Sequence, residues 1–287
     1  MSLKYGIDPE FFCVDVNGLA ISPALLEREC GLRPVIDDLK HPIYHINSEK
    51  NFSWMMDGVA FELTILKPLQ TAVEMYDIVN YSLNFLENMI KNLDQGLELY
   101  KKPVVGIDPE RYVPLLDNER IYQGFIFGCD KDYDAILSDY VCETQDVTTH
   151  KYRYAGGHCH TSGCKFFEHY IPAIKLMAVC VGNYFIANSP YPDLERQRAL
   201  TYGRPGRYRI QKYRNGDSGL EYRTPSNSWL SFPLSGYEEM IRMTELAVHF
   251  LETERIDIIQ NYLDDTIKAI TTADQTLARK ILEEINQ

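Results

Sequence analysis

The sequence lacks the features that direct a chain to a membrane or to secretion. No apolar run reaches the ~18 residues of a membrane-spanning helix, and no signal-peptide h-region follows Met1–Tyr5. The seven cysteines are an odd number and accompany no secretion signal, a usage typical of reduced intracellular thiols. We therefore expect a cytoplasmic protein with no membrane partner.

The chain is also poor in positive charge and in linker sequence. It has 29 Lys and Arg against 41 Asp and Glu, a net charge of −12, whereas nucleic-acid binding needs a basic surface. No Gly-, Ser- or Pro-rich segment divides the 287 residues, of which 45% are hydrophobic. We expect no nucleic-acid partner and a single domain over residues 1–287 with a substantial core.

Several segments carry strand patterns. Residues 4–22 predict a β-hairpin around Asn17-Gly18, a dipeptide suited to a type I′ turn because both central residues need positive φ. Residues 59–66 alternate with the period of a strand that has one apolar face. Residues 152–162 resemble a glycine-kinked strand, and residues 219–230 a strand that Pro225 ends.

Helix patterns separate and follow these strands. A capping-box signature, Thr71 to Glu74, precedes a helix that runs to about residue 93. Residues 166–188 are apolar nearly all round, which predicts a buried helix, and residues 236–285 predict two or three amphipathic helices. Together these patterns predict an α+β fold with one antiparallel sheet and helices on one face. Residues 1–235 form the sheet and its helices, and residues 236–287 the C-terminal helices.

The pentapeptide GIDPE occurs twice, at residues 6–10 and 106–110. The residues that follow the two copies share no pattern, so an internal duplication is not indicated. We interpret the second copy as a loop and turn without a functional role.

Polar side chains recur on one face of the predicted strands. His158 and His160 are two residues apart, so both point to the same side of an extended strand. The full set is two carboxylates from separate strands, the histidine pair, and a carboxylate with a guanidinium: Glu10, Glu62, His158, His160, Glu221 and Arg223. If these faces form one surface, it is lined with oxygen and nitrogen ligands suited to magnesium or manganese.

A basic tract interrupts the acidic sequence late in the chain. Seven cations fall within one short stretch: Arg196, Arg198, Arg204, Arg207, Arg209, Lys212 and Arg214. Arginine binds phosphate oxygens through paired hydrogen bonds. The tract therefore indicates a phosphate-binding surface, or alternatively a set of cations that balance nearby acids.

Other interpretations of the same residues remain. An isolated glutamate or His-x-His on an exposed strand is commonly only solvated. A zinc site would use His158, Cys159, His160 and Cys164. On a strand, however, Cys159 points away from both histidines, and the spacing matches no common zinc-finger pattern.

Six blocks, taken in order, resemble the phage-type carboxylate–amine ligases. These are predicted amidoligases of the glutamine synthetase/glutamate–cysteine ligase superfamily. The blocks are GIDPEFF, DGVAFEL, FGCDKDYDA, RYAGGHCHTS, YGRPGRYR and EYRTPSNSW, and the resemblance extends from residue 6 to about residue 230. Four residues depart from the family pattern: Lys131, Cys159, Thr161 and Ser162. The departures put the substrate preference in doubt more than the catalysis.

The resemblance implies a glutamine-synthetase-like antiparallel sheet whose concave face binds ATP and Mg²⁺ or Mn²⁺. It places Glu10, Glu62 and Glu221 as metal ligands with His158 and His160 beside them. It also places the arginines of the YGRPGRYR block, Arg204, Arg207 and Arg209, near the nucleotide phosphates. We expect Arg153 to bind the nucleotide as well.

The activity that follows is an ATP- and Mg-dependent carboxylate–amine ligase that forms an amide or peptide-like bond through an acyl phosphate. Arg207, Arg209 and Arg223 would stabilise the charge on the transferred phosphoryl group, and Asp57 would accept the proton of the amine. The partners would be a small-molecule or peptide carboxylate and an amine; the sequence indicates no oligomeric state. The alternatives are a non-catalytic nucleotide- or peptide-binding relic of the fold, and a metallohydrolase built on His158 and His160.

Overall fold

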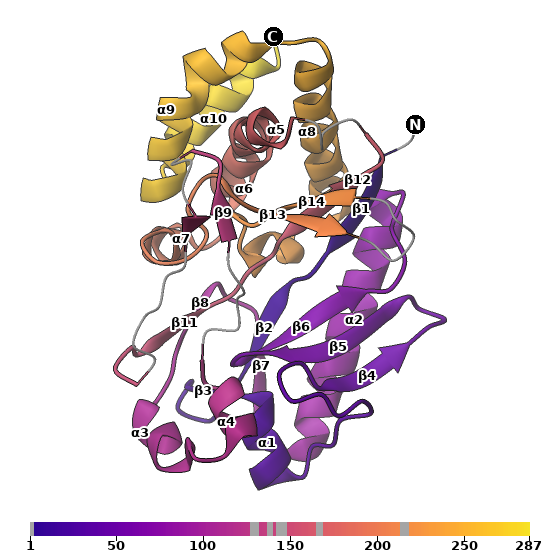
Figure 1. Cartoon of the computed structure of the whole chain (residues 1–287), viewed down its shortest axis with the longest axis vertical. Coiled ribbons are helices and arrows are strands. Elements are labelled where there is room, and N and C mark those ends of the chain that lie inside the picture. Colours follow the sequence, from indigo (N-terminus) through magenta and orange to yellow (C-terminus); the bar gives the residue numbers. More distant parts are fainter. Residues whose placement is uncertain (1–2, 127–131, 137–139, 142–147, 165–168, 213–217) are drawn as a thin grey trace.

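The computed structural model describes residues 3–126, 132–136, 140–141, 148–164, 169–212 and 218–287 (Figure 1). These residues form a mixed α+β fold in which the strands of each sheet are antiparallel. The first sheet has the order β1 (Lys4–Ile7), β12 (Cys159–Ser162), β14 (Ser218–Tyr222), β13 (Arg207–Lys212), β9 (Asp132–Asp134) and β10 (Tyr140–Val141). The second has the order β3 (Ala20–Ile21), β2 (Glu10–Val14), β6 (Ala60–Ile65), β5 (Phe52–Asp57) and β4 (Ile43–Asn47), and β7 (Glu98–Tyr100) also pairs with β2.

The single sheet predicted from the sequence is therefore wrong. The chain leaves the first sheet after β1 and enters the second at β2, and only Asp8 and Pro9 lie between them (Figure 1). β1 pairs with β12, whereas Glu10 of β2 pairs with Glu62 of β6. Two residues thus join the two sheets, and the polar strand faces are divided between them.

The predicted glycine-kinked strand also divides. β11 (Tyr152–Tyr154) pairs with β8 (Val104–Gly106) in a separate two-stranded sheet, while β12 belongs to the first sheet. Between them a Cβ on Gly157 would lie 2.2 Å from the carbonyl oxygen of Ser226. The backbone therefore approaches too closely for any side chain at residue 157, and the strand cannot continue straight.

The N-terminal hairpin forms, but with another turn. β2 and β3 pair, and Gly18 has a φ of 73°, whereas Asn17 does not adopt positive φ. The Asp15 carboxylate accepts hydrogen bonds from the N–H groups of Asn17 and Leu19. This Asx-type turn replaces the type I′ turn, because a side chain upstream satisfies the turn amides.

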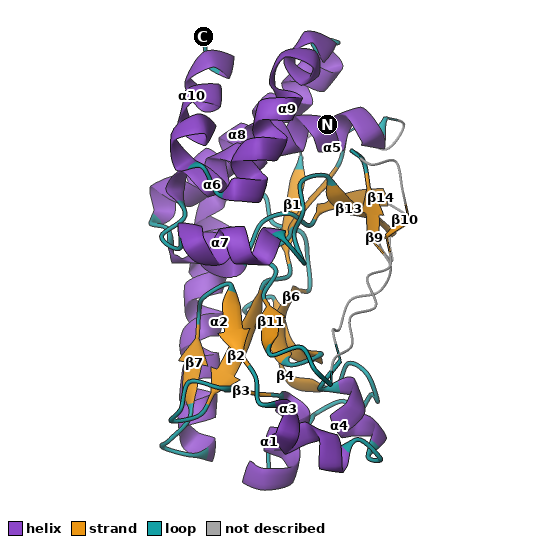
Figure 2. Cartoon of the chain, turned by 90° about the vertical axis from the view of Figure 1, so that its left-hand side faces the viewer, coloured by secondary structure: helices purple, strands orange, loops and turns teal. Residues whose placement is uncertain are grey.

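The long helices agree with the sequence patterns. α2 (Ala72–Leu93) has the predicted capping box between Thr71 and Glu74, and it lies against the second sheet (Figure 2), where the Trp54 indole donates to the carbonyl of Ser82. Three C-terminal helices follow: α8 (Leu234–Glu252), α9 (Ile256–Thr272) and α10 (Gln275–Ile285). α8 packs on α2 and α5 (Tyr170–Met177). The division at residue 235 stays a prediction.

The stretch from Tyr170 to Asn188 has the length and mean hydropathy (1.5) of a membrane-spanning helix, contrary to the expectation that no such run exists. It comprises α5, a π-helical turn (Ala178–Gly182) and α6 (Asn183–Asn188). Most of it (78%) is buried inside the protein, as predicted for a core helix.

Short helices complete the fold. They are α1 (Pro23–Cys30), α3 (Pro109–Tyr112), α4 (Glu119–Gln123) and α7 (Pro192–Ala199), with 3-10 turns at Val113–Leu115 and Asn227–Ser231. The second GIDPE copy runs from the end of β8 into α3: Asp108 caps the helix N-terminus, Pro109 occupies its first turn and Glu110 is exposed. In this copy the same five letters start a helix, whereas in the first copy they carry the chain from one sheet to the other.

Candidate functional site

The register of the first sheet places its polar residues on one face. His160 pairs with Glu221, and Glu221 pairs with Arg209, so the three side chains form a row across β12, β14 and β13. The neighbouring row, Cys159, Tyr222 and Tyr208, is buried on the opposite face, where α5 lies against β14. The face of this sheet opposite α5 therefore holds the candidate site.

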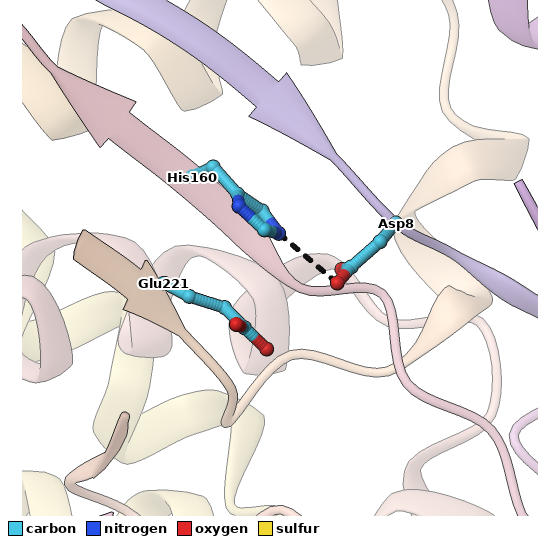
Figure 3. Close-up of side chains that lie close together, drawn as sticks. All are labelled: Asp8, His160 and Glu221. Atoms are coloured by element: carbon cyan, nitrogen blue, oxygen red, sulfur yellow. Dashed lines mark ion pairs between the residues drawn. The ribbon is translucent and has the colours of Figure 1, made fainter. Parts of the chain in front are cut away.

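One ligand cluster consists of Asp8, His160 and Glu221 (Figure 3). Their ligand atoms lie within 4.8 Å of one another, and His160 Nε2 is 3.0 Å from Asp8 Oδ2. Gly6 pairs with His160 in the sheet, and a Cβ there would lie 3.3 Å from the His160 Cβ. The glycine of GIDPE thus makes room for the imidazole, and its aspartate contacts it. We name this the histidine cluster.

Charge pairing governs the protonation of this cluster. Burial alone would raise the pKa of Asp8, but His160 and His158 outweigh it and the net shift is downward. Burial lowers the pKa of His160, yet the Asp8 carboxylate reverses the shift and the net direction is upward. Burial would likewise raise the pKa of Glu221, but Arg223 outweighs it and lowers that pKa. Both carboxylates therefore stay ionised, as metal ligands must.

A second cluster consists of Glu10, Asp57 and Glu62, again with ligand atoms within 4.8 Å of one another. Glu10 and Glu62 are directly paired across β2 and β6, and Asp57 ends β5. Burial and then the Asp57 charge raise the pKa of Glu10 to about 8 and raise the pKa of Glu62 well above its usual value. We name this the carboxylate cluster.

The carboxylate cluster fits a divalent cation. Its three acids share one sign, and Asp57 Oδ1 is buried without a hydrogen-bond partner among the described residues. A buried acid without a partner is costly, and hard oxygen ligands are those that Mg²⁺ and Mn²⁺ prefer. A cation would both neutralise the repulsion and complete the coordination of Asp57.

This repulsion predicts a pH dependence of stability. Because the folded-state pKa of Glu10 is about 8 against 4.5 in a model peptide, the metal-free folded state binds the proton more tightly. The stabilisation is complete below pH 4.5 and is lost as pH rises through 8. Between these values we expect the free energy of unfolding to fall by up to about 1.4 kcal/mol per pH unit.

Urea titrations from pH 5.5 to 7.5 in chelator measure this slope. Asp57→Asn removes the charge that most raises the pKa of Glu10, so the free energy of unfolding of this variant should depend less steeply on pH. Asp265→Asn, on the exposed part of α9, should leave the slope unchanged. A slope that Asp57→Asn leaves intact would contradict the assignment.

Three residues lie between the two clusters and together contact both: the buried His158 and Arg223, and the half-buried Tyr202. Arg223 donates from Nη1 to Glu221 Oε1 and from Nη2 to the Tyr202 hydroxyl, 3.1 Å away. His158 Nδ1 lies 3.1 Å from Asp8 Oδ1, and burial, reinforced by Arg223, lowers the pKa of His158. His158 therefore contacts Asp8 and helps to hold its carboxylate in place, whereas His160 is the imidazole that belongs to the ligand cluster.

The predicted phosphate-binding arginines separate in the structure. Arg209 lies on the site face with Nη1 4.0 Å from Glu221, and Arg207 is buried with Nε 3.9 Å from Asp134. Arg204 donates to the carbonyl of Leu200. Arg223 is committed to Glu221, so it positions a ligand rather than facing a phosphate. Arg214 and Lys131 lie outside the described residues.

Arg153 does not join the site. Its guanidinium donates to the carbonyls of Phe125, His150 and Tyr152 and stacks on the Phe125 ring, 4.9 Å from its centroid. The side chain is buried on β11, outside the first sheet. The prediction that Arg153 binds the nucleotide is therefore wrong, because backbone carbonyls occupy its donors.

This contact set predicts a structural phenotype for Arg153. Removal of the guanidinium in Arg153→Met leaves three carbonyls without this donor, and we expect a loss of about 2–4 kcal/mol of unfolding free energy. Any rise in melting temperature that Mg²⁺ causes in wild type should persist in the variant. Urea unfolding measures the free energy of unfolding, and thermal shift measures the response to Mg²⁺. Loss of the Mg²⁺ response in a fully folded variant would show that Arg153 contributes to the site.

Asp8 and Tyr202 are site residues that the sequence analysis did not name. Asp8 had a usable signal, since it stands two residues before Glu10 in GIDPE, the spacing used for the histidine pair. Tyr202 had none, because its contacts come from a loop that follows α7. Cys159 points away from the histidines as predicted, with Sγ toward the Gly157 carbonyl, which argues against the zinc alternative.

Comparison with known proteins gives little further constraint. No protein-family model matches the chain, and no curated protein matches it. Among solved structures, a bifunctional glutathione synthetase from Pasteurella multocida is similar over 100% of this chain, with 9% sequence identity and a TM-score of 0.41. The chain spans about half (49%) of that protein. A similarity at this level does not establish a family or an activity.

Proposed function

We propose that the protein is an ATP- and Mg-dependent carboxylate–amine ligase that forms an amide or peptide-like bond through an acyl phosphate. The supporting observation is that two acidic ligand clusters, one on each sheet, lie close to arginines of the first sheet. Phosphoryl transfer needs clustered cations and guanidinium groups around the phosphates, and little other chemistry. We also propose that the sheet that carries the site is glutamine-synthetase-like.

Each cluster has a role in the proposal. Asp57 with Glu10 and Glu62 would hold one cation, and Asp8 with His160 and Glu221 would hold another. Bound Mg²⁺ would supply neutralisation of the triphosphate charge. Because Asp57 belongs to the carboxylate cluster, we assign it to the cation and not to the proton of the amine.

The arginines divide into binding and positioning groups. Arg209 lies beside Glu221 and is partly exposed, so we assign it to the phosphate oxygens. Arg207 lies on the same strand and is buried. Arg223 holds Glu221 in the orientation in which it meets Asp8 and His160. The proposed substrates are a small-molecule or peptide carboxylate and an amine, and the proposed location is the cytoplasm.

Hydroxylamine provides a general test. As a small nucleophile it converts an acyl phosphate to a hydroxamate, so no knowledge of the amine is needed. With Mg-ATP and a panel of amino-acid and peptide carboxylates, we expect hydroxamate and ADP in equal amounts from wild type and from Glu110→Gln. Glu62→Gln should form neither product.

The nucleotide product separates the alternatives. Release of AMP and pyrophosphate would indicate an acyl adenylate and contradict the acyl phosphate. Tight binding of Mg-ATP without any hydroxamate would indicate the non-catalytic relic.

A further inference from the structure

Tyr202 joins the two ligand clusters. Its hydroxyl oxygen lies 3.4 Å from Glu10 Oε1, 3.1 Å from His158 Nε2 and 3.1 Å from Arg223 Nη2. Glu10 is a member of the carboxylate cluster, and His158 and Arg223 contact Asp8 and Glu221 of the histidine cluster. One phenol thus touches groups of both clusters, which lie on different sheets.

The donors and acceptors at this oxygen allow only some arrangements. A guanidinium can only donate, so Arg223 donates to the phenol oxygen, while the phenol has a single proton to give. That proton goes to Glu10 or to His158 Nε2. If it goes to Glu10, His158 Nε2 carries a proton and donates to the phenol; otherwise His158 accepts. The phenol therefore links the hydrogen bonding of Glu10 to the orientation of His158.

The ring of Tyr202 is held rigidly. It packs on the Arg198 guanidinium, 4.8 Å from its carbon atom to the ring centroid. Arg198 is itself buried and donates to the carbonyls of Ala155, Thr224 and Pro225 at 2.6–3.0 Å. The next residue, Gly203, has a φ of 72°, and a Cβ there would lie 1.9 Å from Arg198 Nη1. The phenol oxygen is thus fixed by groups outside the clusters.

We infer that Tyr202 is a positioning residue that holds Glu10 and His158 in the geometry that both clusters need to bind cations. The inference rests on the proposed function in one respect, that the clusters bind divalent cations. Partners that orient metal ligands commonly change metal affinity by 10–100-fold when they are removed.

The test compares Tyr202→Phe with Tyr154→Phe. Phenylalanine at residue 202 keeps the ring on Arg198 and removes only the hydroxyl. Tyr154 is a matched control because its hydroxyl also contacts an imidazole nitrogen, His150 Nε2 at 3.1 Å, away from both clusters. The readout is Mn²⁺ affinity, from the signal of free Mn²⁺ in electron paramagnetic resonance, with thermal melting of the metal-free protein alongside.

We expect Tyr202→Phe to bind Mn²⁺ 10–100-fold more weakly than wild type and Tyr154→Phe to bind it unchanged. If Tyr202→Phe melts lower yet binds Mn²⁺ as wild type does, while Glu62→Gln loses Mn²⁺, the hydroxyl is only structural and the inference is wrong although the proposed function stands. If wild type binds no Mn²⁺, the metal site and this inference fail together.

Discussion

Glu62→Gln is expected to stabilise the metal-free protein and to weaken its response to Mg²⁺. In the absence of a cation, Glu62 is buried close to Glu10 and Asp57. The amide keeps the size of the side chain and is neutral at every pH, whereas Glu62 must bind a proton to be neutral in this site. The free energy of unfolding should therefore rise by on the order of 1 kcal/mol, and the melting temperature should rise with it. The same change removes a ligand of the carboxylate cluster, so the stabilisation by the cation held there disappears.

The size of the wild-type response makes this prediction measurable. A ligand at ~100 times its dissociation constant adds about 2.7 kcal/mol, which corresponds to roughly 5 °C or more in a chain of this length. Thermal shift with and without Mg-ATP, after chelation, gives both quantities. Glu110→Gln, the same substitution at the exposed glutamate of the second GIDPE copy, should behave as wild type in both conditions. A Glu62→Gln protein that gains as many degrees from Mg-ATP as wild type does would exclude the carboxylate cluster as a cation site.

Arg223→Met is expected to cause the largest loss of stability. Arg223 is 2% exposed and Glu221 is fully buried, and removal of one partner from a buried pair leaves a charge in the interior. Such changes commonly cost about 3–5 kcal/mol. His160 and Arg209 remain near Glu221, which favours the lower end of this range.

A surface pair provides the comparison. Arg242 forms a bidentate pair with Glu239 on α8 and is about half exposed, so Arg242→Met should cost at most about 1 kcal/mol. Urea unfolding of the two variants measures the difference. The double substitution Arg223→Met with Glu221→Gln should recover part of the loss, because no unpaired charge is left. If Arg223→Met and Arg242→Met lost the same unfolding free energy, the result would contradict a buried charge at Glu221.

Local patterns predicted the elements better than their assembly. The capping box defined α2, and the side-chain alternation of residues 59–66 correctly placed Phe61 and Leu63 in the core beside Glu62 on the other face. The two-sheet arrangement could not be predicted, because whether a strand continues or changes sheet at Asp8-Pro9 depends on its partners. β1 finds its partner at residues 159–162, far along the chain.

The sequence analysis named the candidate-site residues that lie on strands and missed those that lie in loops. Glu10, His160 and Glu221 follow from strand periodicity, whereas Tyr202 and Asp8 lie between elements. Arg153 shows the opposite error: the acceptors that satisfy it are backbone carbonyls, and these have no signature in a sequence. Buried arginines that bind carbonyls cannot be told from phosphate-binding arginines by residue type.

The hydrogen bonds between the first two strands and the last quarter of the chain have a consequence for biosynthesis. The Tyr5 hydroxyl contacts Glu245, 240 residues away, and the Asn227 amide donates to the Glu10 carbonyl across 217 residues. While the chain emerges from the ribosome, β2 can pair with β6 early, but β1 must wait for β12, and long-range pairing of this kind is slow. The second sheet and α2 can therefore form early, whereas the site can close only after residue 227 has emerged. Nascent chains should expose the edge of β1 to chaperones until residues 159–162 have emerged.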